Sequence, residues 1–355
     1  MTKDGAVPEY LLPLEAIAQE PIEPRDHARL LVDMGPDHVT HQRVEHRQVR
    51  DLPEYINDGD VIVVNDTKVL PARLLGRKDT GGVVEVFLLE PNQALDQGGH
   101  TQEWKAMVRP GARVAPGTQL NIEAGPGEIS LSVEVGERLE DGLRMVRLFS
   151  QGADVLEDIS HCGQIPLPPY INTVLENPDR YQTVYARVPG SVAAPTAGLH
   201  LTEDVLKRCR QKGAKIATVD LAVGLGTFRP VTADLLADHH MHEERFSVPL
   251  ETMEACKVAK RVVAIGTTSV RALESAAATG SLTGRTSLFI SGDYKWQMVD
   301  VLMTNFHQPR STLLAMIESF IGTRWQELYS IALSEGYRFL SFGDAMLLSR
   351  RHSHV

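Results

Sequence analysis

Four short apolar runs, each followed by a polar turn, recur along the chain. They are rich in β-branched residues and predict buried strands over 60–64, 215–223, 261–265 and 299–303. The turns that follow, over 65–67, 224–230, 266–269 and 304–307, hold polar residues and glycine. Because the carboxyl ends of strands line the ligand crevice of an open α/β sheet, we expect these four turns to meet at one site.

Helical patterns lie between and after these strands. Thr202 and Ser311 are suitable N-caps for two helices, the second with its apolar residues at i, i+3 and i+4 spacing. Thr267, Thr268 and Ser269 are N-cap types for a helix over 270–276. A last helix over 324–334 and a pair of strands over 337–348 complete this part. Residues 1–58 predict a peripheral lead-in with one or two strands.

The segment between these patterns has a different character. From about residue 68 to residue 150, short runs of Val, Leu and aromatic residues alternate with Gly, Pro and Asp turns. Such spacing without helical periodicity is typical of a small antiparallel barrel or sandwich. The predicted fold is therefore an α/β domain with a mixed sheet, formed by residues 1–66 and 151–355, with an antiparallel β-barrel domain inserted over 67–150.

Composition narrows the class of protein. With 355 residues the chain can form two domains, and 43% hydrophobic and 23% charged residues are ordinary for a globular protein. No apolar run is long enough for a membrane span, and charges and prolines near the N-terminus do not resemble a signal peptide. Three scattered cysteines form no C-x-x-C pair, which argues against a disulfide framework. We expect a cytoplasmic monomer.

Charge is unevenly distributed. The net charge of −10 argues against a large basic face, yet residues 67–113 hold seven basic and five acidic side chains. That local excess is weak evidence for a polyanionic partner, because scattered cations are usually a solvated surface.

The turn over 266–269 is a candidate anion site. A strand that runs through a hydroxyl-rich turn into a helix leaves backbone N–H groups unpaired at the positive end of the helix dipole. Thr267, Thr268 and the guanidinium of Arg271 would together suit a carboxylate or a phosphate. The alternative is an ordinary capped turn that binds nothing.

Two further segments have competing interpretations. Gly224 and Gly226 follow a strand, but the third glycine and the helix of a dinucleotide fingerprint are missing, which leaves a turn against which a ligand could lie. Residues 238–244, with His242 and Glu244, form the densest titratable cluster. Metal binding, a solvated loop and acid–base chemistry are all compatible with it.

Nine stretches together resemble the S-adenosylmethionine:tRNA ribosyltransferase-isomerases of queuosine biosynthesis. In chain order they are VVNDTKVLPARL, IPLPPYI, YQTVYA, PTAGLHL, VGLGTFRPV, MHEERF, IGTTSVRALES, VDVLMTNFHQPRSTLL and YRFLSFGDAM. The resemblance spans nearly the whole chain, but the ends (residues 1–50 and 349–355) carry little of it. Gly292-Asp293 stands where the family usually has Pro-Gly, and Gln308 replaces a usual Leu.

The resemblance implies an unusual reaction. The ribosyl unit of S-adenosylmethionine would be transferred and rearranged onto 7-aminomethyl-7-deazaguanine at the wobble position of tRNA, giving epoxyqueuosine-tRNA, adenine and methionine. S-adenosylmethionine is then a consumed substrate, and neither a cofactor nor a metal is expected.

Roles follow for residues within the matching motifs. His200, His242 and Glu244 are acid–base candidates. Donor and target base would be bound by Asp66, Gly224, Gly226, Thr267, Thr268, Arg271, Asn305 and His307. Phosphates of tRNA would be bound by Lys68, Arg73, Arg77 and Arg109.

Two other functions are compatible with parts of the sequence. The first is a tRNA methyltransferase that uses the same donor, although the glycine-rich turn after the first strand of such folds is absent. The second is a non-catalytic RNA-binding module built around the inserted barrel. A methyltransferase would release S-adenosylhomocysteine, whereas the ribosyltransferase-isomerase would release adenine. An RNA-binding module would bind tRNA without binding S-adenosylmethionine.

Overall fold

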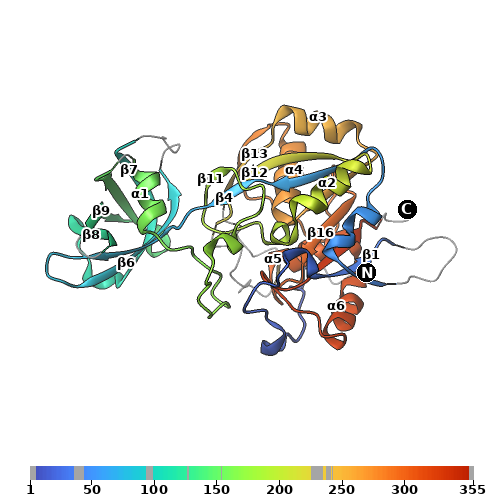
Figure 1. Cartoon of the computed structure of the whole chain (residues 1–355), viewed down its shortest axis with the longest axis horizontal. Helices are drawn as coiled ribbons and strands as arrows, with labels where there is room; N and C mark the ends of the chain where they lie inside the picture. The colour runs from blue at the N-terminus through green and yellow to red at the C-terminus, as the bar shows by residue number, and fades with distance from the viewer. Residues whose placement is uncertain are drawn as a thin grey trace. The chain divides into compact units, whose positions relative to one another are not determined.

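The computed structural model describes residues 5–35, 44–92, 99–125, 128–152, 154–224, 235–236, 241 and 243–351 (Figure 1). The chain divides into two compact units. One comprises Met1–Thr67, Pro168–Val188 and Ala194–Val355, and the other comprises Lys68–Leu167 and Pro189–Ala193. The chain passes between the units after Thr67, Leu167, Val188 and Ala193, and the first and third of these points lie within the short strands β4 (Thr67–Val69) and β11 (Val188–Ser191).

The first unit is built on a nine-stranded mixed sheet. In spatial order its strands are β15 (Thr283–Thr286), β13 (Glu244–Ser247), β12 (Lys215–Leu221), β3 (Asp60–Asn65), β14 (Arg261–Ile265), β16 (Val301–Asn305), β17 (Ala345–Ser349), β1 (Arg29–Asp33) and β2 (Glu45–Gln48). The four strands β12, β3, β14 and β16 are mutually parallel, so their carboxyl ends share one edge.

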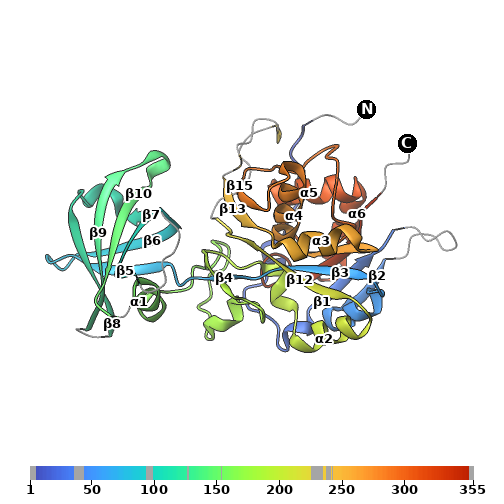
Figure 2. The same cartoon turned by 90° about the horizontal axis from the view of Figure 1, so that it is seen from above.

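Helices cover both faces of this sheet. In Figure 2, α3 (Leu250–Val258), α4 (Thr267–Thr279), α5 (Thr312–Ile321) and α6 (Arg324–Ser334) lie on one side, and α2 (Glu203–Gln211) lies on the other. The α2 side also holds the short helices η3 (Val49–Tyr55) and η7 (Thr196–His200), which supply side chains to a core with Ile62, Val64 and Ile265. Because both faces are covered, every residue of β3 is buried, as the continuous apolar run predicts.

The predicted strands and caps are largely confirmed, with three corrections. Thr202 and Ser311 cap α2 and α5 through their side chains. The strand expected over 299–303 begins at Val301, because the Val299 N–H donates to the buried Glu274 carboxylate of α4 (3.1 Å). Only β17 forms where two strands were expected over 337–348, and β1 lies inside the main sheet, beside β17, rather than at the periphery.

The second unit is a closed six-stranded antiparallel barrel, which confirms the predicted fold class. Around the barrel run β10 (Arg144–Ser150), β7 (Thr101–Arg109), β6 (Val83–Pro91), β5 (Arg73–Arg77), β8 (Thr118–Gly125) and β9 (Glu128–Arg138). Alternate residues point inward, and Trp104 is completely buried among them. Gly76 faces inward, where a Cβ would come within 2.9 Å of the end of the Ile122 side chain and 3.0 Å of the Leu120 Cβ, so a larger residue would crowd the barrel core.

Helix α1 (Val155–Cys162) packs on this barrel, against β8, β9 and β10. The barrel unit therefore continues to Leu167, whereas the predicted domain boundary places residues 151–167 in the α/β domain.

Candidate functional site

A cleft in the α/β unit opens at the carboxyl ends of β14 and β16. Its volume is about 600 Å³, including space that is open to solvent. The residues that line it are Tyr170, Ala194, Pro195, Thr196, Ala197, Val223, Gly266, Thr267, Thr268, Thr304, Asn305, Phe306, His307, Gln308, Ser311, Leu313, Leu340 and Ser341. Two of the four predicted turns, over 266–269 and 304–307, thus contribute to one site, while no residue of 65–67 is among those that line it and most of 224–230 lies outside the described residues.

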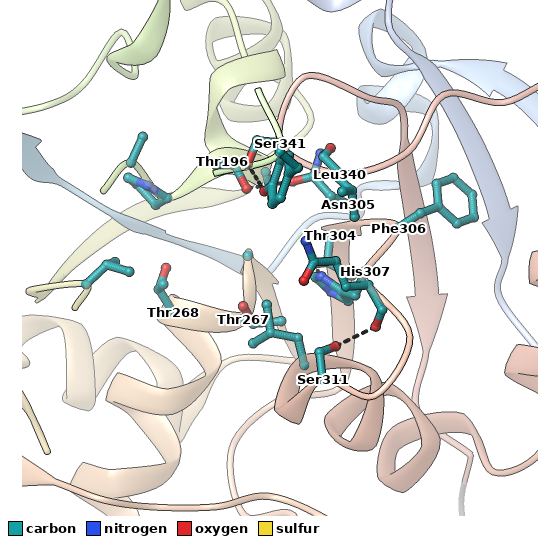
Figure 3. Close-up of a pocket in the computed structure, with 18 residues that line it drawn as sticks. Thr196, Thr267, Thr268, Thr304, Asn305, Phe306, His307, Ser311, Leu340 and Ser341 are labelled. Atoms are coloured by element: carbon teal, nitrogen blue, oxygen red, sulfur yellow. Dashed lines mark hydrogen bonds between the residues drawn. The ribbon is translucent and has the colours of Figure 1, made fainter. Parts of the chain in front are cut away.

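The N-terminus of α4 forms one wall of this cleft. Figure 3 shows Thr267 and Thr268 on the side opposite Thr196 and Ser341. Gly266 has φ 84° and links β14 directly to α4, so the helix starts at Thr267 and no side chain caps it. This corrects the expectation that a hydroxyl residue of the turn is the N-cap. Glycine is favoured here, because other residues rarely adopt that conformation.

Thr268 is the notable residue of this wall. Its hydroxyl oxygen is buried and has no hydrogen-bond partner among the described residues, and the side chain lines the cleft. A buried polar group without a partner costs free energy, so native proteins rarely retain one unless a ligand or water satisfies it. Together with the unpaired N–H groups of the first turn, this hydroxyl makes a site for an acceptor group such as a carboxylate.

Asn305, at the end of β16, is fixed by a network on the opposite wall. Its Oδ1 accepts from the Thr196 hydroxyl (3.0 Å), and its Nδ2 lies 3.2 Å from the Leu340 carbonyl oxygen. Nδ2 also lies 3.0 Å from Nε2 of His200. Because the carbonyl can only accept, Nδ2 is the donor, and His200 must therefore accept through an unprotonated Nε2.

His200 is consequently neutral and lies behind Asn305. Burial lowers its pKa to about 3, assisted by the positive charges of Arg338, Arg180 and Arg25. It is not among the residues that line the cleft. In this arrangement His200 orients Asn305.

His307 lies in the cleft wall and is also buried. Burial lowers its pKa to about 3, so the imidazole is neutral at pH 7. Its Nε2 is hydrogen-bonded to the hydroxyl of Thr304 (3.0 Å). A neutral, oriented imidazole is suited to hydrogen bonding with a ligand rather than to pairing with an anion.

Arg271 and Glu244 form a buried ion pair with each other. Arg271 lies on α4 and Glu244 on β13, and neither lines the cleft. Glu244 Oε1 also accepts from the backbone N–H of Gly224 (3.0 Å). The guanidinium predicted to bind a substrate carboxylate thus has a carboxylate of the protein as its partner.

Asp66 and Asp220 lie side by side at the carboxyl ends of β3 and β12. The Asp66 N–H donates to the Val219 carbonyl (2.9 Å), and both carboxyl groups are buried. Arg187 pairs with Asp66 (2.8 Å) and Arg245 with Asp220 (3.1 Å). Burial raises the pKa of Asp220, against the opposing effect of Arg245, and the negative charge of Asp66 raises it further.

Two predicted site residues, Gly226 and His242, lie outside the described residues, as do most of the residues in the titratable cluster over 238–244. Within the described ranges, no group of three or more His, Cys, Asp or Glu side chains is arranged to hold a metal ion. In the same ranges, every helix is too short or too polar to cross a membrane.

The predicted tRNA-binding residues lie on the barrel unit and are all exposed. Arg73 and Arg77 project from the outer face of β5, and Arg109 is opposite Glu85 in the β6–β7 register. Arg73 also pairs with Glu85 (2.5 Å), which neutralises part of this basic face.

Sequence reasoning missed several residues of the cleft and its edge. Thr196, Tyr170 and Ser341 lie in motifs that were recognised as whole stretches, without assigning roles to their hydroxyl groups. The hydroxyls of Tyr170 and Ser341 are hydrogen-bonded to each other (2.7 Å) across 171 positions of sequence. Asp220 stands within the apolar run 215–223, and an acid inside a buried strand was the signal that could have identified it. Gln308, one of the departures from the family pattern, lines the cleft.

Comparison with known proteins gives consistent matches over nearly the whole chain. A family model described as queuosine biosynthesis protein matches residues 8–348. The S-adenosylmethionine:tRNA ribosyltransferase-isomerase of Rubrobacter xylanophilus is 49% identical over 341 residues, which are 96% of each chain. The protein of that name from Thermus thermophilus is 48% identical over 356 residues, covering 96% of this chain and 98% of its own.

A solved structure is similar as well. The crystal structure of S-adenosylmethionine tRNA ribosyltransferase from Thermotoga maritima is 36% identical to this chain and superposes with a TM-score of 0.52. The match covers 96% of this chain and 99% of that one. The resemblance inferred from the nine sequence stretches is thereby confirmed.

Proposed function

The chain belongs to the queuosine biosynthesis protein family, and we propose that it transfers and isomerises the ribosyl moiety of S-adenosylmethionine onto 7-aminomethyl-7-deazaguanine in tRNA. The wobble position of tRNA is the proposed target. The products are epoxyqueuosine-tRNA, adenine and methionine. The enzyme class, a transferase that also isomerises, follows from the family, while the identity of the acceptor base and of the products is our proposal.

The observation that carries this proposal is the unsatisfied Thr268 hydroxyl beside the uncapped start of α4. The methionine end of the donor carries a carboxylate, which the first-turn N–H groups and this hydroxyl would bind. Gly266 and Ala197 leave the backbone open to close approach by a ligand. The adenosine portion would then extend along the cleft toward Asn305 and His307.

The chemistry requires a base and an acid near the donor ribose. A sulfonium acidifies the neighbouring C5′ protons, so a modest base generates an ylide, and an acid assists departure of adenine. His242 and Glu244 are the proposed acid–base candidates, and Glu244, which does not line the cleft, would act only when its ion pair with Arg271 opens. Asp220 is an additional candidate for the acid, because burial raises the pKa of its carboxyl group.

The other predicted residues take supporting roles in this proposal. His200 would act through Asn305, whose amide it holds, rather than on the substrate. Arg271 would contribute positive charge from behind the anion site while paired with Glu244. Lys68, Arg73, Arg77 and Arg109 of the barrel would contact tRNA phosphates, as a polyanionic substrate requires.

Product analysis tests the function directly. The protein is incubated with S-adenosylmethionine and tRNA that carries the aminomethyl-deazaguanine, and adenine release and the mass of the tRNA are measured. Free adenine with a mass gain on the tRNA is expected. S-adenosylhomocysteine would instead identify a methyltransferase, and tRNA binding without donor binding would identify an RNA-binding module.

A Thr268→Val variant tests the site. It keeps the shape of the side chain but removes the hydroxyl, and we expect the Kd for S-adenosylmethionine to rise about tenfold, since a hydrogen bond to a charged group contributes about 1.5 kcal/mol or more. Thr279→Val, at the other end of the same helix, is the matched control and should bind the donor normally. Equal donor affinity in both variants would place the carboxylate elsewhere.

A further inference from the structure

The N-terminal segment, which the family match includes from residue 8, is hydrogen-bonded to two segments that border the cleft. The N–H of Ala18 donates to the Phe339 carbonyl (3.2 Å), and the Phe339 N–H donates to the Ala16 carbonyl (2.7 Å). The residue after Phe339 is Leu340, which lines the cleft. Earlier in the segment, the Pro8 carbonyl accepts from the N–H of Arg310 (2.9 Å), just beyond the cleft-lining Gln308.

Tyr10 makes the most direct of these contacts. Its hydroxyl donates to the backbone carbonyl of His307 (2.6 Å), and the N–H of His307 donates to the hydroxyl of Tyr329 on α6 (3.0 Å). The backbone of His307 is thus held on both sides by tyrosine hydroxyls. The rings of Tyr10 and Tyr329 also pack edge-to-face, with centroids 5.0 Å apart, which fixes the spacing of the two hydroxyls.

The consequence concerns the imidazole of His307. This residue follows β16 in a turn without regular backbone pairing, so the two hydroxyls replace the hydrogen bonds that a strand would supply. Among the residues that the structure describes, the ring is hydrogen-bonded through Nε2 to Thr304, three residues away. A shift of the peptide would therefore move the imidazole within the cleft.

We propose that Tyr10 is a positioning residue, whose hydroxyl sets the position of the His307 imidazole for binding of the nucleoside donor. Tyr10 is not among the residues that line the cleft and acts only through the His307 peptide. Burial raises the pKa of both Tyr10 and Tyr329, so both hydroxyls keep their protons at neutral pH. The inference rests on the proposed function, because it takes the cleft to be the donor site.

The test is a Tyr10→Phe variant of the full-length protein, which removes the hydroxyl and keeps the ring contacts. The Kd for S-adenosylmethionine is measured by calorimetry without tRNA, and the Tm is measured in parallel. We expect the Kd to rise about three- to tenfold, the range that loss of one hydrogen bond produces. Tyr329→Phe should act in the same direction.

The matched control is Tyr294→Phe, which removes the hydroxyl that donates to Glu274 (3.1 Å) elsewhere in the same unit. It should lower the Tm by a similar amount and leave the donor Kd unchanged. In a His307→Ala background, Tyr10→Phe should no longer alter the donor Kd, which a general loss of stability would not produce.

Two negative results are distinguishable. If the unmodified protein does not bind S-adenosylmethionine, the proposed function fails. If the unmodified protein binds the donor, two results would overturn the positioning role of Tyr10. One is a Kd for Tyr10→Phe within twofold of that of the unmodified protein, and the other is an equal rise in Kd when Tyr10→Phe is added to His307→Ala.

Discussion

The imidazole rings of His200 and His307 are almost completely buried, and both are neutral at physiological pH. Their roles differ because their neighbours differ. His200 accepts a hydrogen bond from Asn305 and orients it, whereas His307 lines the cleft itself. Sequence reasoning selected both residues from their motifs, but only the surrounding atoms decided which one reaches a ligand.

These buried histidines predict how stability depends on pH. Their pKa of about 3 in the folded state lies below the value of about 6.5 in the unfolded chain, so the unfolded state binds more protons between these values. Their stabilisation is complete above about pH 6.5 and is lost as the pH falls toward 3. Each contributes a slope of about 1.4 kcal/mol per pH unit in this window.

Urea unfolding at pH 7 and pH 5 measures this effect. The free energy of unfolding should be smaller at pH 5, and a His200→Gln variant should lose less between the two pH values than the unmodified protein. An identical loss in both proteins would show that His200 does not titrate differently in the folded and unfolded states.

Helix α4 contributes to the cleft and is also bonded to strand β13. Its first turn faces the cleft, and its Arg271 reaches Glu244 on β13 in a buried ion pair. Its Glu274, which is completely buried, accepts from the N–H groups of Gln297, Met298 and Val299 in the segment that leads into β16. The helix is therefore held by charged side chains whose partners are distant in sequence.

We expect Arg271→Met to destabilise the protein by about 3–5 kcal/mol, because it removes the guanidinium that is paired with the buried Glu244 carboxylate. The double variant Arg271→Met/Glu244→Leu should recover part of this loss. Chemical denaturation of the single and double variants measures both effects. A strong rise in donor Kd for Arg271→Met at unchanged stability would instead mean that Arg271 contacts the donor carboxylate.

The two compact units have different proposed roles, donor binding in the α/β unit and tRNA binding in the barrel unit. The α/β unit holds the cleft, and the barrel unit carries exposed arginines on the outer faces of β5 and β7. Among the described residues Arg77 has no ion-pair partner, whereas Arg73 is paired with Glu85 and Arg147 with Glu103. Arg77 is accordingly the better test of phosphate binding.

Binding of tRNA should weaken steeply with salt, because each neutralised phosphate releases counterions. Arg77→Ala should reduce the slope of log K against log salt by about 0.7–0.9, the range for one phosphate contact in single- or double-stranded nucleic acid. Arg147→Ala, on the same barrel, should leave the slope unchanged. Filter-binding titrations at several salt concentrations measure it, and a slope near zero in the unmodified protein would contradict the assignment.

By itself the sequence determined the local features of the fold, namely the strands, the helix caps and the class of each unit. Periodicity identified the strands over 60–64 and 261–265, the caps Thr202 and Ser311, and a β-barrel between two parts of an α/β fold. These features depend on alternating burial and on hydrogen bonds between residues a few positions apart, which a linear pattern records. The order of the motifs also identified the family.

Tertiary structure alone decided which groups meet. Arg271 and Glu244 are 27 positions apart, Asn305 and His200 are 105 apart, and Tyr10 and His307 are 297 apart. Whether a charged or polar side chain faces a ligand or another part of the protein depends on such long-range contacts, because burial makes the nearest partner decisive. Thr268 is the reverse case, since folding leaves its buried hydroxyl without a partner among the described residues.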